Sequence, residues 1–250
     1  MNLLSLEGVS ARLGALQVLD GVDLRVAAGE VVALCGPNGA GKSSAIRAAL
    51  GLIPLDVGRA TLGGVEVGGL SARARAERAA YLPQERRIAW NMPAIEVAAL
   101  GAPFLKGGEA LERARAALDE VGVGELADRG VAEMSGGERA RVLVARALVA
   151  DAPLLLADEP IAGLDPDAQR LVLERLRARA ARGAGVVVSL HDLSLAAVFA
   201  DRVVVLDHGR SVADGAPMQA LSTDVLRRVF GLAGEWIEGP DGPLLAARRA

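Results

Sequence analysis

The sequence predicts an α/β fold, in which a parallel sheet covered by helices follows an N-terminal antiparallel β layer and carries an inserted α-helical lobe. Strand-like and helix-like segments alternate over residues 154–207, as in β-α-β units. Short strand-like segments with glycine turns fill residues 1–30, and residues from about 90 to 150 have a mostly helical pattern. We expect residues 1–250 to form a single domain with the lobe inserted in it.

The first elements are expected to be short antiparallel strands. Val18–Val26 is a strand candidate, with turns at Gly14 and at Ala28–Gly29. Glu30–Cys35 is short and apolar, which predicts a buried strand. Ser44–Leu50 has a helical pattern. A strand, a loop and a helix therefore follow one another in this part of the chain.

The later elements continue the pattern. The clearest amphipathic segments of the lobe are Glu109–Val121 and Gly137–Ala150. After a buried strand that begins at Leu154, the expected elements are a helix over Asp167–Arg182, a strand over Gly185–Leu190, a helix over Leu193–Ala200 and a strand over Arg202–Asp207. This order favours a parallel sheet.

The loop between the predicted strand and helix matches the phosphate-binding pattern G-x-x-x-x-G-K-[ST]. Its residues are Gly36, Pro37, Asn38, Gly39, Ala40, Gly41, Lys42, Ser43 and Ser44. Glycines let backbone N–H groups surround an anion, Lys42 offers a charge to the β- and γ-phosphates, and Ser43 offers a hydroxyl to Mg²⁺. A chance match in a glycine-rich turn is the alternative, but the strand–loop–helix order favours a nucleotide site.

Two adjacent carboxylates end the buried strand that begins at Leu154. Where a strand ends, both side chains can be brought to one site. Asp158 is placed to hold Mg²⁺, and Glu159 to orient and deprotonate an attacking water. The alternative is an acidic strand end that faces solvent. Together with the phosphate loop, the pair predicts nucleotide hydrolysis.

The segment Met134-Ser-Gly-Gly-Glu-Arg139 precedes the second predicted lobe helix. Ser135 and Glu138 have the spacing of a capping box, which would explain an isolated segment. With the phosphate loop and the Asp-Glu pair, the segment resembles the Leu-Ser-Gly-Gly-Gln/Glu signature of the ATP-binding subunits of ATP-binding cassette (ABC) transporters. Met134 stands where that family usually has Leu.

The resemblance covers nearly the whole chain and implies further site residues. Gln84 resembles the glutamine of the family's Q-loop, which contacts Mg²⁺ and links the nucleotide to the transmembrane partner. Asp165, in Ala-Gly-Leu-Asp, resembles the D-loop that crosses the dimer interface. His191 resembles the switch histidine at the γ-phosphate, an ordinary strand-end histidine being the alternative.

The resemblance also implies a homodimer in which two copies bind head to tail. Each ATP would lie between the phosphate loop of one copy and a signature segment of the other, made of Ser135, Gly136, Gly137 and Glu138. The helix N-terminus after Ser135 would offer N–H groups and a positive dipole end to the γ-phosphate. ATP and Mg²⁺ are the expected cofactors. Opening and closing of the dimer would drive integral membrane permease subunits.

Two positions near the phosphate loop leave alternatives open. The family usually has an aromatic residue that stacks on adenine, and Leu13 stands at that position here. We expect Leu13 to cover the base by apolar contact, with weaker ATP affinity or relaxed base selectivity as a consequence of lost stacking. Cys35 is expected to be a small buried strand residue, and a regulatory thiol is the alternative.

Composition argues against several other classes of protein. The mean hydropathy of +0.32 comes largely from Ala and Val, and no apolar run approaches the roughly 18 to 20 residues that span a bilayer. The single cysteine fits a reducing cytoplasm, and the N-terminus lacks the basic region of a secretory signal. A net charge of −3 gives no general attraction to nucleic acid, and we expect the Arg73–Arg87 segment to be a solvated helix face plus loop rather than an RNA site. No nucleic-acid partner is expected.

The segment His191–Val203 resembles importer subunits for iron chelates, haem and cobalamin, as does the tail from Leu226 onward. Val97–Pro103 resembles this subgroup imperfectly. The resemblance implies an ATPase subunit of such an importer, peripheral at the cytoplasmic face of the inner (plasma) membrane, with a substrate-binding protein as an indirect partner. The alternatives are the ATPase of a lipid or drug exporter and a non-transport ABC ATPase, such as a translation or DNA-repair factor.

Overall fold

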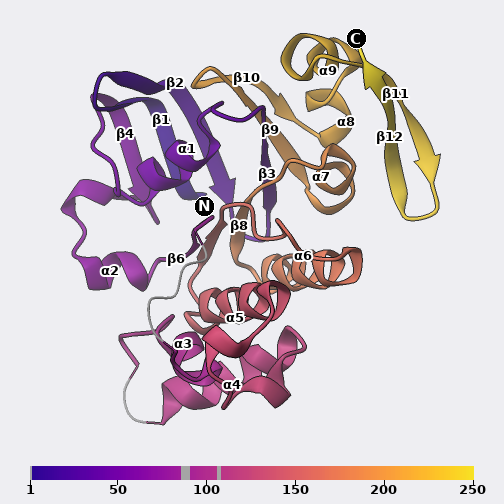
Figure 1. Cartoon of the computed structure of the whole chain (residues 1–250). Helices are drawn as coiled ribbons and strands as arrows, with labels where there is room; N and C mark the ends of the chain where they lie inside the picture. Colours follow the sequence, from indigo (N-terminus) through magenta and orange to yellow (C-terminus); the bar gives the residue numbers. More distant parts are fainter. Residues whose placement is uncertain (1, 86–90, 106–107) are drawn as a thin grey trace.

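The computed structural model describes residues 2–85, 91–105 and 108–250, and its helices lie around two main sheets (Figure 1). The N-terminal antiparallel sheet has the strand order β2-β1-β4-β5. Its strands are β1 (Asn2–Leu13), β2 (Leu16–Ala27), β4 (Val57–Leu62) and β5 (Val65–Glu66). The predicted β layer is confirmed, although its first two strands are long, with 12 residues each.

The central sheet has the strand order β10-β9-β3-β8-β7-β6. Its strands are β3 (Val31–Cys35), β6 (Ala79–Leu82), β7 (Leu154–Ala157), β8 (Gly185–Ser189), β9 (Arg202–Asp207) and β10 (Arg210–Gly215). All neighbours are parallel except β10, which pairs antiparallel with β9 at one edge. The predicted parallel sheet is confirmed, and its carboxyl ends meet at one edge, where open α/β sheets bind ligands.

Alternate residues of β3 enter two separate hydrophobic cores. Val32 and Leu34 face the antiparallel sheet and α1, whereas Val31 and Ala33 face the other helices. Successive strand residues point to opposite faces, so a strand buried on both faces reads as continuously apolar. The helices next to the sheet are α1 (Lys42–Ala49), α5 (Gly136–Val149), α6 (Pro166–Ala181) and α7 (Leu193–Phe199).

In the described part of the segment between β6 and β7 there are three helices, which lie at the lower end of the molecule in Figure 1. They are α3 (Ala94–Ala99), α4 (Glu109–Glu120) and α5, with the short 3-10 helices η2 (Gly124–Leu126) and η3 (Val131–Glu133) between the last two. The α3 end approaches α5 closely, because a Cβ atom on Gly101 would overlap the backbone carbonyl oxygen of Arg146. Only glycine fits at this contact without moving a helix.

We expect Gly101→Ala to lower the free energy of unfolding by about 2 kcal/mol, within the usual cost of overpacking a core. The obstacle is backbone, so a side-chain rotation cannot relieve it. Gly68→Ala is the matched control, because a Cβ atom there meets no atom within 4 Å. Urea unfolding of both variants measures the difference, and equal stabilities would contradict this close packing.

The C-terminal segment adds elements that the sequence did not predict. They are α8 (Pro217–Ala220), α9 (Thr223–Phe230) and a separate hairpin of β11 (Leu232–Gly239) and β12 (Gly242–Arg249). The hairpin is fixed by Trp236, whose Nε1–H donates to the Leu221 carbonyl at 3.0 Å, and by the Leu245 amide, which donates to Ser194 Oγ at 3.0 Å. It lies at the end of the molecule away from the three-helix segment (Figure 1).

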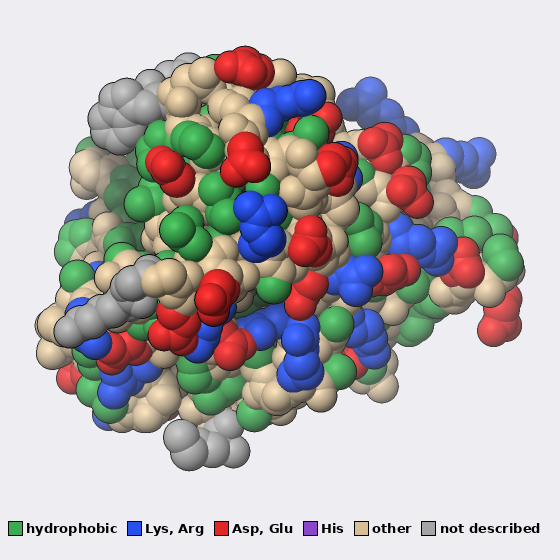
Figure 2. Space-filling model, turned by 90° about the horizontal axis from the view of Figure 1, so that it is seen from below, with side chains coloured by type: hydrophobic (Ala, Val, Ile, Leu, Met, Phe, Trp, Pro, Cys, Tyr) green, Lys and Arg blue, Asp and Glu red, His purple; other side chains and the backbone are tan. Residues whose placement is uncertain are grey.

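The predicted helix face within Arg73–Arg87 corresponds to α2 (Ala72–Ala76), which follows the 3-10 helix η1 (Val67–Gly69), while residues 86 and 87 lie outside the described residues. On the face formed by the three-helix end, acidic, basic and apolar side chains are interspersed (Figure 2). Within the described ranges, no helix combines the length and the apolar character needed to cross a membrane.

Candidate active site

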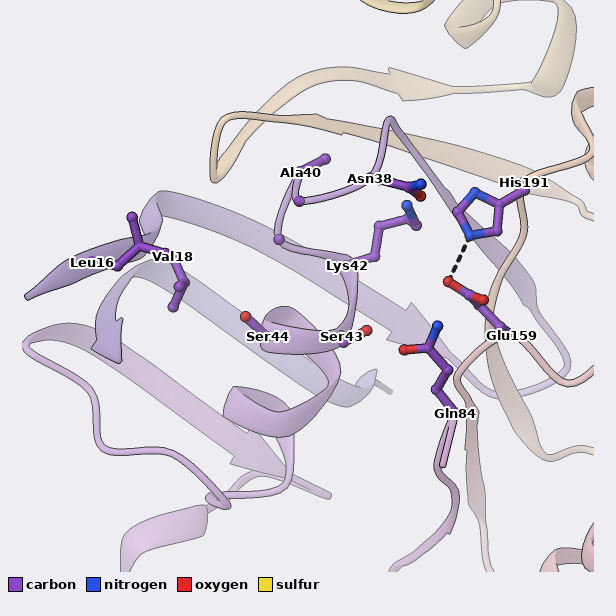
Figure 3. Close-up of a pocket in the computed structure, with 12 residues that line it drawn as sticks. Leu16, Val18, Asn38, Ala40, Lys42, Ser43, Ser44, Gln84, Glu159 and His191 are labelled. Atoms are coloured by element: carbon purple, nitrogen blue, oxygen red, sulfur yellow. Dashed lines mark hydrogen bonds and ion pairs between the residues drawn. The ribbon is translucent and has the colours of Figure 1, made fainter. Parts of the chain in front are cut away.

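A cavity of about 480 Å³ lies at the carboxyl edge of the central sheet. It is lined by Leu16, Val18, Asn38, Gly39, Ala40, Gly41, Lys42, Ser43, Ser44, Gln84, Glu159 and His191. The phosphate loop follows β3, Gln84 follows β6, Glu159 follows β7 and His191 follows β8. The parallel order of the strands thus brings together four segments that are far apart in the sequence (Figure 3).

The phosphate loop has the backbone that its glycines predict. Gly41 has a φ of 104°, which L side chains rarely adopt, and a Cβ atom on Gly36 would overlap the Leu206 carbonyl oxygen. Gly41 is also the N-cap of α1, and no side chain of the described residues caps this end. Since the first amides of a helix lack partners within the helix, they are open to an anion.

Lys42 is a buried cation whose surroundings favour an anionic ligand. Its ammonium donates to the carbonyl oxygens of Gly36 and Pro37, at 2.7 and 3.0 Å. The side chain is only 6% exposed, and burial lowers the pKa of Lys42, against the smaller opposing effect of Glu159 and other nearby acidic groups. A buried cation held mainly by neutral carbonyls is stabilised by an anionic ligand. A phosphate in the cavity would supply that charge.

Asp158 follows β7 and precedes Glu159, which lines the cavity, but Asp158 itself is buried and does not line it. The residue is 1% exposed, and its Oδ1 accepts a hydrogen bond from Ser189 Oγ at 2.7 Å. Its Oδ2 is buried and has no hydrogen-bond partner in the described part of the chain. An unpaired buried carboxylate oxygen is costly unless a cation binds it.

Oxygen-bearing side chains that line the cavity fit Mg²⁺. Ser43 and Gln84 both line the cavity and both carry oxygen ligands, which Mg²⁺ prefers. Among the described residues there is no cluster of three or more His, Cys, Asp or Glu side chains that could hold a metal ion. Sites that bind Mg²⁺ through one or two carboxylates depend on substrate phosphates for further ligands.

Glu159 and His191 form a pair on the wall of the cavity, drawn as a dashed line in Figure 3. Glu159 Oε1 lies 2.6 Å from His191 Nε2, and the two side chains are 15% and 45% exposed. Glu159 has a φ of 49°, an uncommon backbone conformation for a residue with a side chain. Such conformations persist where the surrounding structure holds them and cluster at active sites. The pair is placed to hold or transfer a proton at the cavity.

The residue predicted to cover the base lies in the β1–β2 hairpin, part of which lines the cavity. Leu13 does not line the cavity, whereas Leu16 and Val18 do. Leu13 ends β1 and pairs with Leu16 across the β1–β2 turn. The wall beside the phosphate loop is therefore β2: a Cβ atom on Gly41 would come within 2.8 Å of the Val18 carbonyl oxygen. Leu16 and Val18 are two positions apart in a strand and therefore lie on one face, and this spacing was the signal in the sequence.

The signature segment lies outside this cavity. Ser135 begins α5 with a capping box: its Oγ accepts from the Glu138 amide at 3.2 Å, and Glu138 Oε2 accepts from the Ser135 amide at 2.7 Å. The bond from the Ser135 backbone lowers the pKa of Glu138. Gly136 follows Ser135, and both are exposed. A capping box and an anion-binding helix N-terminus are compatible here, because the capping box uses only part of the free backbone amides at this end of α5.

Asp165 is the N-cap of α6, where its Oδ1 accepts from a backbone amide at 2.9 Å. Its neighbour Leu164 approaches the signature segment, since a Cβ atom on Gly137 would lie 3.8 Å from Leu164 Cδ2. Asp165 is exposed and does not line the cavity. Most predicted site residues thus form two groups on one chain, one with the phosphate loop at the cavity and one at the starts of α5 and α6, whereas Leu13 and Asp158 belong to neither group.

Cys35 precedes the phosphate loop and is fully buried, and this burial raises its pKa to about 12. Reactive cysteines are exposed and have lowered pKa values. We expect Ellman's reagent at pH 8 to leave the native protein unmodified and to titrate one thiol after unfolding in guanidinium chloride. Rapid modification of the native protein would instead support a regulatory thiol.

Comparison with known proteins gives consistent matches in sequence. The model of a family described as ABC transporter matches residues 19–162. The hemin import ATP-binding protein HmuV of Nocardia farcinica is 46% identical over 230 residues, which cover 90% of this chain and 80% of that protein. HmuV of Streptomyces coelicolor is 44% identical over 227 residues, covering 89% and 81%.

Solved structures match over similar lengths. An ATP-binding subunit of an ABC transporter has a TM-score of 0.79 and 33% identity, covering 93% of this chain and 95% of that one. A dimeric ATP-binding cassette in a post-hydrolysis state, bound to ADP and Pi, has a TM-score of 0.78 and 25% identity, covering 86% and 98%. The fold, the cavity beside the phosphate loop and the relatives agree. The chain belongs to the ABC transporter family, as one of its ATP-binding, ATP-hydrolysing subunits.

Proposed function

We propose that this chain hydrolyses ATP to energise an importer for haem or a related iron chelate. The observation that supports the chemistry is the convergence of Lys42 and the Glu159–His191 pair on one cavity. The relatives named for hemin import, at 46% and 44% identity, support the cargo. The competing cargoes are cobalamin, lipids and drugs, and the experiment below distinguishes them from haem.

The residues at the cavity have different roles in hydrolysis. The amides of the phosphate loop and the Lys42 ammonium bind the phosphates. Glu159 accepts the proton of the attacking water, and His191, whose Nε2 lies 2.6 Å from Glu159 Oε1, orients that carboxylate and is assigned the contact with the γ-phosphate. Ser43, Gln84 and Asp158 would hold Mg²⁺, which when bound neutralises charge on the phosphates.

In this proposal residues 1–250 are a single nucleotide-binding domain, with residues 90–150 as the inserted helical lobe. Strands β6 and β7 support it, because they pair in parallel although the lobe separates them in sequence. The central sheet therefore continues across the insertion.

Two copies would bind head to tail as a homodimer. Ser135, Gly136 and Asp165 are exposed and lie outside the cavity of their own chain, so a second chain is needed to bring them to a nucleotide. The similar cassette solved as a dimer supports this arrangement. The dimer would be peripheral at the cytoplasmic face of the membrane, bound to permease subunits and indirectly to a substrate-binding protein.

The testing experiment is affinity purification of the tagged chain from detergent-solubilised membranes of its host, followed by mass spectrometry. Recovery of a many-helix permease supports the proposal, and genetic loss of the chain should then abolish growth on haem as the sole iron source. A Glu159→Gln copy should not restore that growth, whereas the wild-type copy should. Recovery of an exporter, or normal growth on haem with lost cobalamin uptake, would contradict the haem assignment.

A further inference from the structure

Ser189 is a fully buried polar residue at the carboxyl end of β8. It ends a strand that is otherwise formed by glycine and valine, two positions before His191, and the sequence assigned it no role. Its hydroxyl connects the two acidic residues of the site. It donates to Asp158 Oδ1 at 2.7 Å and accepts from the Glu159 amide at 2.8 Å.

The first bond determines which Asp158 oxygen remains available. Because Oδ1 accepts the Ser189 proton, the carboxylate is fixed in rotation and Oδ2 is left without a hydrogen-bond partner among the described residues. That oxygen is the one with capacity for a cation. Without the Ser189 hydroxyl, a buried carboxylate would have two unsatisfied oxygens and no fixed orientation.

The second bond holds the backbone of Glu159. This residue has a φ of 49°, and its amide donates outside the β-ladder, to the Ser189 oxygen. A strained backbone conformation is retained where neighbouring contacts enforce it. The bond therefore fixes the point from which the Glu159 side chain extends toward His191.

We propose that Ser189 is a positioning residue that orients both acidic groups through one hydroxyl, directing Asp158 Oδ2 toward Mg²⁺ and Glu159 toward the attacking water. This proposal rests on the proposed nucleotide-hydrolysing function of the cavity. Ser189 is fully buried and does not line the cavity. It acts by setting the geometry of Asp158 and Glu159.

The test measures how strongly Mg²⁺ tightens nucleotide binding, without any turnover. The dissociation constant of the fluorescent, non-hydrolysable analogue mant-AMPPNP is measured in excess Mg²⁺ and in EDTA, and the ratio of the two constants reports the metal contribution. We expect Ser189→Ala to reduce this ratio about tenfold, the factor given by losing a hydrogen bond to a charged group. The constant in EDTA should stay within about twofold of wild type, because the phosphate loop is intact.

Two further variants separate positioning from general stability. Val187→Ala removes buried atoms from the same face of the same strand, so it should lower the melting temperature without changing the Mg²⁺ ratio. Ser189→Thr keeps the hydroxyl and should restore most of the ratio and of kcat. A Ser189→Ala protein with the wild-type ratio would overturn the proposal. If the wild-type protein bound the analogue equally in Mg²⁺ and EDTA, the Mg²⁺ assignment of the cavity and this proposal would both be overturned; failure to bind the analogue at all would overturn the nucleotide site itself.

Discussion

Replacement of Glu159 by glutamine is expected to abolish ATP turnover and to leave ATP binding intact. Glutamine has the same shape as glutamate and still reaches His191, but its amide does not accept the proton of the attacking water. Loss of a general base costs about 10²- to 10⁴-fold in rate. Because the bound triphosphate persists, the variant should accumulate as a dimer that the wild-type protein forms only transiently.

Two measurements check this expectation. Phosphate release gives the rate, and size-exclusion chromatography in ATP and Mg²⁺ gives the fraction of dimer. Glu174→Gln is the matched control, since Glu174 is an exposed α6 residue that lies 3.8 Å from Arg170 and outside the cavity. The control should hydrolyse ATP at the wild-type rate. Fast hydrolysis by the Glu159 variant would remove Glu159 from the role of base.

Local patterns in the sequence predicted strands β3, β7, β8 and β9 of the central sheet, though not β6 or β10, and they predicted the cavity residues other than Leu16 and Val18. The apolar segment before Gly36, the carboxylates after β7 and the histidine after β8 each carry their signal within a few residues. Their convergence follows from the parallel order of the strands, because carboxyl ends of parallel strands meet at one edge. A pattern of β-α-β units therefore predicts both the sheet and the place of its site.

Features that depend on contacts between distant segments were not predicted. Leu16 rather than Leu13 lines the cavity because the β1–β2 hairpin places β2, not the end of β1, beside the phosphate loop. Ser189 gains its role from Asp158 on the neighbouring strand, 31 positions away in sequence. Nothing in the local sequence around Ser189 contains that information.

The turn of the C-terminal hairpin has a sequence signal from which the hairpin could have been predicted. Gly239 pairs with Gly242, so Pro240 and Asp241 form the turn between β11 and β12. Proline, aspartate and glycine together are a turn signal with a known mechanism. The sequence thus contains a signal for the hairpin. The hydrogen bond through which Trp236 docks the hairpin could be seen only in the structure.

Lys42→Ala is expected to remove nucleotide binding without weakening the fold. The ammonium is the main positive charge that a phosphate meets in this cavity, and truncating one partner of a buried charge pair costs about 2 to 5 kcal/mol, or at least about 30-fold in affinity. Arg73→Ala is the control, because it removes an exposed cation that pairs with Glu77 and does not line the cavity.

Thermal unfolding distinguishes lost binding from lost structure. Burial lowers the pKa of Lys42, which means that the charged form is less favourable in the folded chain than in the unfolded one. Removing this charge should therefore leave the melting temperature without nucleotide unchanged or raised. Wild type should gain stability with increasing ATP, as expected for a ligand that binds the native state, and the variant should not. An equal ATP-induced shift in both proteins would show that the phosphates bind elsewhere, and a lower melting temperature without ATP would show that Lys42 supports the fold rather than the ligand.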